Sequence, residues 1–394
     1  MPESYEAVVK EVTRSIKPAV ERELWGRAAG RCEFKGCNEL LYKSRVTQER
    51  VNLAEKAHIY SFAEKGPRGW GPFRTNRKQS NEIGNLLLVC HACHETIDQH
   101  NSDTRYPASL LLAWKSAHED RVRIGTGIHP NKRSHVILYG GKIGEEDSPL
   151  DAGLAVEAMF PEWYPAEERP SDLRMCSEHD DGTELFWKTE SAHLRSVFER
   201  QIRPRIAEAN PNHFSVFARA SQPLLILLGS LLTDKVPAEV YQLQREPIGW
   251  RWQSEQNGAA FRTVTPDDAS GAPVLLVSLS ARIEPRRVTE VVGDNVCIWE
   301  LTIDGCHNDF LKSRAQLSAF RETARKLMAR IAEAHGCRIP LRIFPAMPVA
   351  CAVELGRIRM PKADMPWIVY DQNHKAGKFL EALEIGGNHV GQDG

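Results

Sequence analysis

Apolar positions recur along the chain with two different periods, and these separate expected helices from expected strands. Helical spacing over residues 5–30 predicts an N-terminal helix, with Pro18 as a break or kink and Gly30 at its end. The same spacing over residues 108–123 predicts a second helix, which opens at Pro107 because proline suits the first helical turn. Two helices are therefore expected to flank a segment of different character.

Inside that segment the apolar residues come in short runs typical of strands. One run covers residues 51–59 and ends near His58, and a second covers residues 86–89 directly after Asn85. A polar loop from Lys65 to Ser80 separates them, and a short helix is expected from Cys93 onward. The order is strand, loop, strand, helix.

From residue 135 onward, strand and helix patterns alternate. Strands are expected over 135–139, 214–220, 239–243, 273–280, 296–303, 341–344 and 367–370, and helices over 191–209, 223–235, 313–335 and 349–357. Two of these stretches share an order: a proline before the helix, Leu-Gly in or near its end, and a tyrosine in the next strand. This self-similarity predicts duplicated α/β units.

The change of pattern divides the chain into two expected domains. We expect an N-terminal domain over residues 1–124, a Gly-containing linker over 125–134 and a C-terminal domain over 135–394. The C-terminal domain is expected to consist of two α/β halves, about 135–265 and 266–394, so the predicted fold class is α+β and multidomain.

Composition narrows the class of protein. The chain has 394 residues, enough for two or three domains, and a formal net charge of −1, so any nucleic-acid contact must come from local patches. Nine cysteines, five of them scattered, favour a reducing compartment. No long apolar segment indicates export or a membrane span, so a cytoplasmic protein without a membrane partner is expected.

Four cysteines form the firmest chemical signal. Cys32 and Cys37 make one short knuckle, and Cys90 and Cys93 make another. Two such pairs can supply four thiolates to one tetrahedral Zn²⁺ ion, although the first pair is more widely spaced than usual. Four sulfur ligands leave no open position, so this zinc is predicted to be structural.

The residues between and after the knuckles supply candidate chemistry. The motif Asn-Leu-x-x-x-Cys-x-x-Cys-His runs from Asn85 to His94, with His58 upstream. This order resembles the HNH (ββα-metal) nuclease family over roughly residues 20–122. The resemblance implies that His58 is the general base, that Asn85 orients its loop, and that His94 binds a catalytic divalent ion, by default Mg²⁺.

One position departs from that family pattern, and one loop is open to two interpretations. Ala57 stands where many HNH sites have an aspartate that binds the metal. Either Glu55 or Asp98 substitutes for it, or the metal is held by His94, phosphate and water alone. The basic loop is either simply solvated or a DNA-binding surface, and its interleaved aromatic residues favour the second. The candidate DNA-binding residues are Arg68, Arg74, Arg77 and Lys78.

Two Rossmann-like halves after an HNH nuclease resemble the HNH–SAVED effectors of bacterial cyclic-oligonucleotide-based anti-phage signalling (CBASS). The supporting segments are 222–229, 241–245, 250–252, 278–280, 355–357 and 367–370. The resemblance implies a SAVED sensor of two CARF-like halves that binds a cyclic di- or trinucleotide made by a partner nucleotidyltransferase. Binding would drive oligomerisation to dimers or tetramers, and the nuclease would then degrade double-stranded DNA with little sequence preference.

Such a ligand needs cations or helix N-termini for its phosphates and aromatic faces for its bases. The candidates are Lys235, Arg245, Trp250, Trp252, Arg357 and Tyr370. Each has a structural alternative: the tryptophans and the tyrosine as core residues, and Arg357 as a helix cap. Two other functions stay open, an HNH restriction endonuclease whose C-terminal domain recognises modified DNA, and a non-catalytic zinc-ribbon binding protein.

Overall fold

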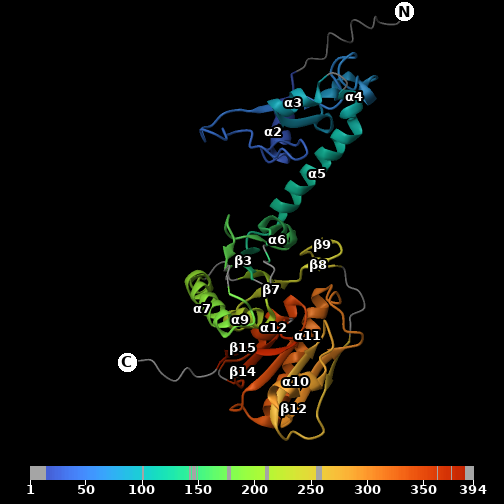
Figure 1. The fold of residues 1–394 in the computed structure, drawn as a ribbon. Helices are drawn as coiled ribbons and strands as arrows, with labels where there is room; N and C mark the ends of the chain where they lie inside the picture. The colour runs from blue at the N-terminus through green and yellow to red at the C-terminus, as the bar shows by residue number, and fades with distance from the viewer. Residues whose placement is uncertain are drawn as a thin grey trace, which may run out of the picture. The chain divides into compact units, whose positions relative to one another are not determined.

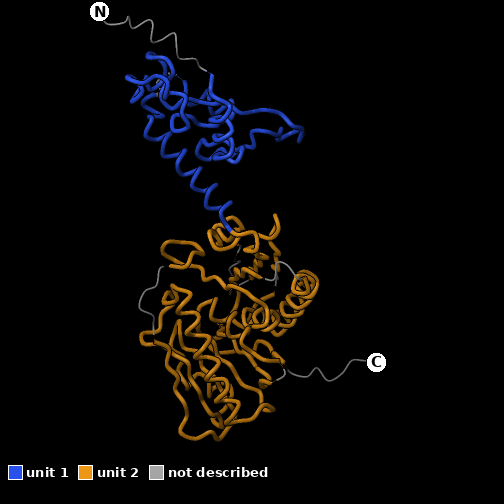
Figure 2. Tube along the Cα trace, turned by 180° about the vertical axis from the view of Figure 1, so that it is seen from behind, with its two compact units in different colours: residues 1–128 blue, residues 129–394 orange. Residues whose placement is uncertain are grey.

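The computed structural model describes residues 15–99, 102–141, 143, 148, 150–174, 179–208, 213–253, 260–361, 363–373 and 375–386. The chain separates into two compact units, residues 1–128 and 129–394 (Figure 2). The break at Ile128 lies within the segment expected to be a linker. In the described residues, no helix is long and apolar enough to span a membrane.

Unit 1 is built around a small antiparallel sheet. Strand β1 (Ala54–His58) pairs with β2 (Leu86–Cys90), and His58 lies opposite Leu86 in the register. The remaining elements are α2 (Pro18–Arg27), η1 (Gly71–Phe73), η2 (Arg77–Asn81), η3 (Ile83–Asn85), α3 (His91–Ile97), α4 (Ser102–Arg105) and α5 (Ala108–Gly127). Both expected strands and the short helix after them are present, so the predicted order of strand, loop, strand and helix is confirmed.

Two boundaries in unit 1 differ from expectation. Helix α2 begins at Pro18, which takes the first-turn position that its ring geometry favours, and the expected helix before residue 15 lies outside the described residues. Helix α5 continues through Gly125 and ends at Gly127, so the linker prediction was wrong for these residues. The Thr126 hydroxyl donates to the carbonyl of Val122 at 2.6 Å, which supports this last turn.

The first half of unit 2 contains a mostly parallel sheet with strand order β4-β3-β6-β7, in which β5 also pairs with β3. Its elements are β3 (Arg133–Gly140), α6 (Ala152–Met159), β4 (Tyr164–Pro165), β5 (Ser171–Asp172), α7 (Glu184–Gln201), α8 (Arg203–Ala207), β6 (Phe214–Arg219), α9 (Gln222–Leu232) and β7 (Ala238–Tyr241). A small hairpin of β8 (Gln244–Arg245) and β9 (Ile248–Gly249) follows.

The second half contains a sheet with strand order β10-β12-β11-β13-β14-β15. Its elements are β10 (Phe261–Val264), β11 (Ala272–Ser278), α10 (Pro285–Val292), β12 (Val296–Ile303), α11 (Arg314–His335), β13 (Leu341–Ala346), α12 (Val349–Ile358), β14 (Trp367–Asn373) and β15 (Lys378–Ile385). Because β10 pairs with β12, this half already begins at Phe261 rather than near residue 266.

The predicted duplication is visible as the same order of elements, and the same Phe–Tyr ring stack, in the two halves. In the first half, β6, α9 and β7 follow one another, and Phe217 stacks on Tyr241 with ring centroids 4.4 Å apart. In the second half, β13, α12 and β14 repeat this order, and Phe344 stacks on Tyr370 at 4.3 Å. The shared tyrosine of the two sequence stretches therefore occupies equivalent positions in the two sheets.

Helices α9 and α12 join the two halves and lie side by side at the centre of unit 2 (Figure 1). They cross at the Leu-Gly pairs that the sequence repeats. A Cβ atom on Gly229 would lie 1.9 Å from the carbonyl oxygen of Val353, and one on Gly356 would lie 1.9 Å from that of Ile226. The two helices therefore approach more closely than any side chain at these positions would allow.

Candidate functional site

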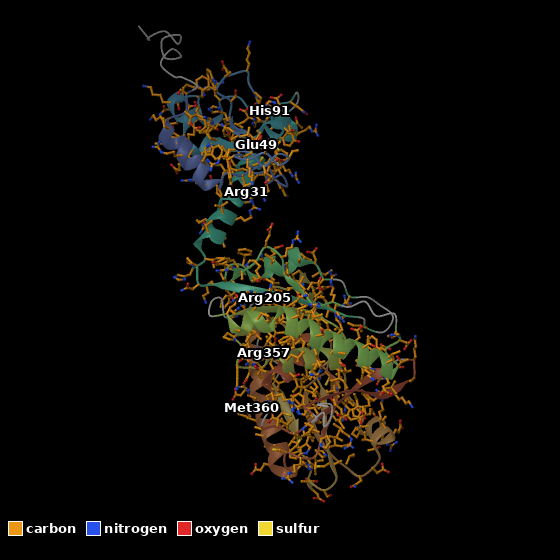
Figure 3. The ribbon with its side chains drawn as sticks, turned by 90° about the vertical axis from the view of Figure 1, so that its left-hand side faces the viewer. Arg31, Glu49, His91, Arg205, Arg357 and Met360 are labelled. Carbon is orange, nitrogen blue, oxygen red and sulfur yellow. The ribbon has the colours of Figure 1, made fainter. Side chains whose placement is uncertain are left out.

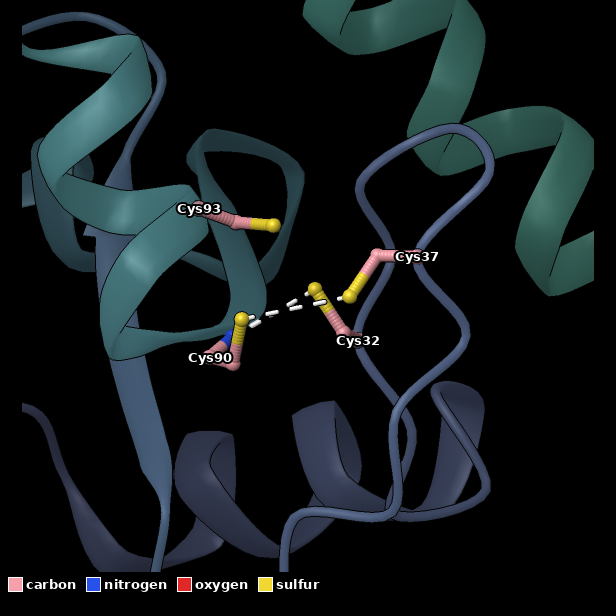
Figure 4. Close-up of side chains that lie close together, drawn as sticks. All are labelled: Cys32, Cys37, Cys90 and Cys93. Carbon is pink, nitrogen blue, oxygen red and sulfur yellow. Dashed lines mark hydrogen bonds between the residues drawn. The ribbon is translucent and has the colours of Figure 1, made fainter.

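The four knuckle cysteines of unit 1 meet at one point, because the turn after residue 31 faces the junction of β2 and α3 (Figure 4). Their sulfur atoms all lie within 4.8 Å of one another, and the Sγ atoms of Cys37 and Cys90 are 3.9 Å apart. In a tetrahedral zinc–thiolate site with bonds of about 2.3 Å, neighbouring sulfurs are about 3.8 Å apart. The cluster therefore fits the expected ion.

Burial makes this cluster a poor place for free thiolates. It raises the pKa of the Cys32 thiol to about 12, and the nearby sulfurs of Cys37 and Cys90 add to this effect. Such a group stays neutral at pH 7 unless a cation compensates the thiolate charge. The donor set thus has the chemistry of a metal site as well as its geometry.

His58 is the last residue of β1, and a network around Asn85 fixes the loop that follows it. The Asn85 side chain accepts a hydrogen bond from the Tyr60 amide at 2.8 Å and donates to the carbonyls of Tyr60 at 3.0 Å and Ser80 at 2.8 Å. The Ile59 amide donates to the Asn85 carbonyl at 2.8 Å. A buried amide with this many partners rigidly holds the backbone beside His58.

The His58 ring has a partner that the sequence analysis missed. Its Nε2 atom lies 2.9 Å from Oδ1 of Asn81, whose Nδ2 group donates to the Ser15 carbonyl at 3.4 Å. With the amide oriented in this way, Nε2 is the donor of this hydrogen bond. Asn81 stands four residues before Asn85, but nothing in its own position distinguishes it from a loop residue.

His94 and Asp98 lie one turn apart on the same side of α3 and its end. Nε2 of His94 is 3.6 Å from Oδ2 of Asp98, and the other Asp98 oxygen accepts a hydrogen bond from Arg68 at 2.9 Å. Arg68 also donates to the Ile97 carbonyl at 2.8 Å and contacts the His58 carbonyl at 3.5 Å. One guanidinium therefore ties the end of the β1 strand to the end of α3.

This arrangement distinguishes the two substitutes considered for the aspartate that Ala57 replaces. Side chains alternate along a strand, so Glu55 and His58 point to opposite faces of β1. Glu55 instead lies 3.6 Å from the exposed ring of His91. Asp98, in contrast, lies 3.6 Å from His94 and is linked to the His58 carbonyl through Arg68, so of these two acids only Asp98 is placed next to His94.

The basic loop does not present its arginines as expected. The Arg68 side chain is 3% exposed and bound to carbonyls and Asp98, so a direct phosphate contact is incompatible with its position. Arg77 stacks over Trp70 at 4.6 Å and donates to the Phe62 carbonyl, and Arg74 pairs with Glu64 at 3.4 Å. Lys78 is exposed. Of the two aromatic residues in this loop, Trp70 therefore packs against a charge, whereas Phe73 packs edge-on against Tyr60.

In unit 2, three of the six predicted ligand residues are core residues. Trp250 is 3% exposed and packs edge-on against Phe217, and Tyr370 is 4% exposed in its stack on Phe344. Arg357 lies in the interior of unit 2 (Figure 3) and is 2% exposed. It binds Glu354 at 2.6 Å and the Val236 carbonyl at 2.7 Å, so it holds the two halves together.

The other three are closer to the surface. Lys235 follows α9 and Arg245 lies on β8, and both are exposed. Trp252 is half-buried, and its indole donates to Glu239 at 3.1 Å. No contact in the described residues gathers these three side chains into one site.

Instead, the carboxyl ends of the parallel strands in the two halves meet where α9 and α12 begin. The Gln222 side chain accepts from the Met347 amide at 3.1 Å, and the Gln242 side chain accepts from the Ala350 amide at 3.1 Å. Ser221, the residue before α9, is 7% exposed, and its hydroxyl has no hydrogen-bond partner among the described residues. Sheets of this kind bind ligands at this edge.

We call this place the carboxyl-edge site, defined by Ser221, Gln222, Ser280 and Met347. The Ser280 amide donates to the Ala346 carbonyl at 2.7 Å, which places the turn after β11 beside the entry of α12. The sequence analysis noted the segments around Gln222 and Ser280 but chose larger side chains as ligand residues. Gln222 and Ser280 both lie shortly after buried strands, and this position was the sequence signal for their place at the sheet edge.

Comparison with known proteins agrees with this architecture. Residues 194–385 match the family model described as "SAVED: SMODS-associated and fused to various effectors sensor domain". This part of the chain therefore resembles a SAVED sensor domain. It includes α9, α12 and the whole second sheet, but only β6 and β7 of the first sheet. No curated protein matches the chain.

Solved structures similar to the chain include two Cap4 receptors with SAVED/CARF domains. The Acinetobacter baumannii receptor with the cyclic trinucleotide 2′3′3′-cAAA is 12% identical, with a TM-score of 0.39, and the match covers 78% of this chain and 66% of that one. The Moraxella osloensis receptor is 9% identical, with a TM-score of 0.39 and coverages of 72% and 59%. The matches thus span less than two thirds of the length of these receptors.

Proposed function

We propose that the chain is a metal-dependent DNA endonuclease whose activity is switched on by a cyclic oligonucleotide in anti-phage defence. The observation that carries this proposal is a SAVED-like stretch in the same chain as a unit in which Asn81 and Asn85 fix His58 and its loop, and Arg68 links the His58 carbonyl to the His94–Asp98 pair. The description of this sensor family as fused to various effectors supports a division into sensor and effector units.

In the proposed reaction, His58 accepts the proton of the attacking water. The hydrogen bond to Asn81 orients the ring, and the Asn85 network holds the loop after β1 in place. His94 and Asp98 would hold a divalent ion such as Mg²⁺, which would neutralise charge on the scissile phosphate. A Zn²⁺ ion in the cysteine cluster would hold the knuckle turn against β2 and α3.

The cyclic oligonucleotide would bind at the carboxyl-edge site. The N-termini of α9 and α12 offer amide groups and positive dipole ends for phosphates, and the unpartnered Ser221 hydroxyl offers one further hydrogen bond. Ligand-driven dimers or tetramers would then bring nuclease units together. A partner nucleotidyltransferase would supply the ligand.

The test is plasmid cleavage with Mg²⁺ across a panel of cyclic di- and trinucleotides. One ligand should trigger cutting by the wild-type protein, and His58→Ala should lower the rate by at least about 100-fold because a general base is lost. His91→Ala is the matched control, since this histidine is 74% exposed next to the same motif and should leave cutting intact.

The outcomes separate the proposed functions. Equal activity of His58→Ala and wild type would refute the assigned base. Cutting that needs no nucleotide and is confined to modified DNA would indicate the restriction function instead. Absence of cutting with every ligand and substrate would leave a sensor domain joined to a zinc-binding unit.

A further inference from the structure

Unit 1 carries a second basic surface, on the side of the first cysteine knuckle. Residues 40–53 leave the knuckle, project from the unit as a long blue loop (Figure 1) and return to β1. The backbones of Lys43 and Arg50 pair across this hairpin, and Val46 at its tip is 90% exposed. We define the knuckle face as Arg31, Lys35, Lys43, Arg45 and Arg121, and Figure 3 labels Arg31 and Glu49 of this region.

The cations of the knuckle face line two adjoining hollows. A hollow of about 270 Å³ is lined by Arg31, Lys43 and Arg45, among others. A second hollow of about 490 Å³ is lined by Lys35 and Arg121 together with Trp114 and Phe34. Asn38 borders both hollows.

Asn38 also joins the elements that carry these cations. Its carbonyl accepts from Arg31 at 3.0 Å, and its side chain accepts from Arg121 at 2.7 Å. The first arginine belongs to the knuckle and the second to α5. One residue therefore fixes the spacing of the two guanidinium groups.

The charge of this face is not neutralised by the protein. No carboxylate in the described residues lies within 4.0 Å of a cation of the knuckle face, whereas Arg68 and Arg74 of the loop at 65–80 are both paired with acids. Glu39 is the acid that lines the first hollow. Cations held in position but not paired are the kind of groups that bind phosphates and release counterions.

We propose that the knuckle face binds the backbone of double-stranded DNA. This inference rests on the proposed nuclease function, because it takes the substrate from the chemistry of the site around His58. It transfers the main DNA contact from the loop at 65–80 to the hairpin, the knuckle and α5. The face supplies affinity without sequence recognition, which suits a nuclease of low specificity.

The experiment measures binding of a short fluorescent DNA duplex by anisotropy at several salt concentrations, with full-length protein in a His58→Ala background so that no DNA is cut. Lys43→Glu with Arg45→Glu should weaken binding at least about tenfold at 0.1 M salt and lower the salt slope by about 2, one unit per lost phosphate contact. Neutral Gln substitutions at both positions should give an intermediate loss.

The matched control reverses the charge of two exposed residues of α7, by Lys188→Glu with Arg200→Glu. It changes the net charge of the protein by the same amount as the Lys43→Glu, Arg45→Glu variant. It should alter affinity by less than about twofold, because at this ionic strength exposed charges outside the DNA contact are screened. If the knuckle variant binds duplex as tightly as this control, the inference is wrong. Tighter binding of single-stranded RNA than of duplex by the parent protein would also overturn it.

The same proteins, with His58 restored, separate this inference from the proposed function. If duplex binding depends on Lys43 and Arg45 but no ligand triggers cleavage, the inference about the knuckle face stands and the proposed nuclease function is refuted. If the two substitutions change neither ligand-triggered cleavage nor duplex binding, the proposed nuclease function stands and the inference about the knuckle face is refuted.

Discussion

The close backbone contact between α9 and α12 can be tested by adding one methyl group, through a glycine-to-alanine substitution. In Gly229→Ala the new Cβ would lie 1.9 Å from the Val353 carbonyl oxygen and 2.9 Å from the Arg357 amide nitrogen. Both contacts are to backbone atoms of α12, so no side-chain rotation can relieve them. Restoring a contact of about 3.5 Å requires the two helices to separate by more than about 1 Å.

The expected cost follows from two opposing effects. Overpacking of a core costs about 1–3 kcal/mol, and a backbone clash in a helix with buried residues on both sides belongs at the upper end. Alanine gains about 1 kcal/mol over glycine in helix propensity. We therefore expect Gly229→Ala to destabilise unit 2 by about 2 kcal/mol, and Gly356→Ala, with its 1.9 Å contact to Ile226, to do the same.

The double variant gives a sharper test. A single separation of the helices relieves both clashes, so its cost should be well below the sum of the two single costs, with a coupling of about 1 kcal/mol or more. Urea unfolding followed by circular dichroism measures all of these values. Gly26→Ala is the control, because no atom lies within 4 Å of the position that a Cβ would take on this helical glycine, and it should gain stability. Wild-type stability of Gly229→Ala would refute the argument.

Three further predictions concern the metal cluster, a half-buried acid and the contact between the halves. Cys37→Ser should reduce bound zinc, measured by mass spectrometry, and lower the melting temperature of unit 1, whereas zinc content equal to wild type would contradict the cluster. Burial, with repulsion from Asp181, raises the pKa of Asp371 to about 7, so stability present at acidic pH is lost as the pH rises from about 4 to about 7. Asp371→Asn should therefore stabilise unit 2 by about 2 kcal/mol at pH 8 but not at pH 4 in urea titrations, and an equal effect at both pH values would exclude this cause. Arg357→Met should cost about 3 kcal/mol in the same assay, at the lower end of the range for a broken buried pair because Glu354 keeps Arg321 at 3.0 Å. A neutral effect would show that the ion pair is dispensable.

The sequence predicted most of the fold where local pattern and burial agree. Strand β12 spans Val296–Ile303 as expected, and α9, α12 and β14 lie within one to three residues of their predicted ranges. Each of these elements is a short apolar run bounded by Pro, Gly or polar residues. The spacing of the apolar residues within the run therefore shows whether it is a helix or a strand. The end of α5 was missed because glycine only weakly opposes helix and the last turn depends on a local side-chain bond.

The site was predicted only as far as local order determines it. His58, Asn85 and His94 could be proposed from the sequence because their elements are consecutive, whereas Asn81 and Arg68 join this region through contacts that form only on folding. Trp250 and Tyr370 were proposed as ligand residues because aromatic chemistry suits a nucleobase. A sequence does not state which face of a strand is buried when both faces carry apolar residues, and here these rings face the core.

The glycine crossing also bears on how such a sensor can diversify. Two separate subunits that meet through identical helices obey twofold symmetry, so every change appears twice and assembly depends on protein concentration. In this chain one polypeptide carries both halves, and their high effective concentration removes that association step. Each half can then change its strand-end residues independently, as Arg219 at the end of β6 and Ala346 at the end of β13 already differ. Two halves joined in one chain can therefore evolve an asymmetric binding surface without weakening the contact between α9 and α12.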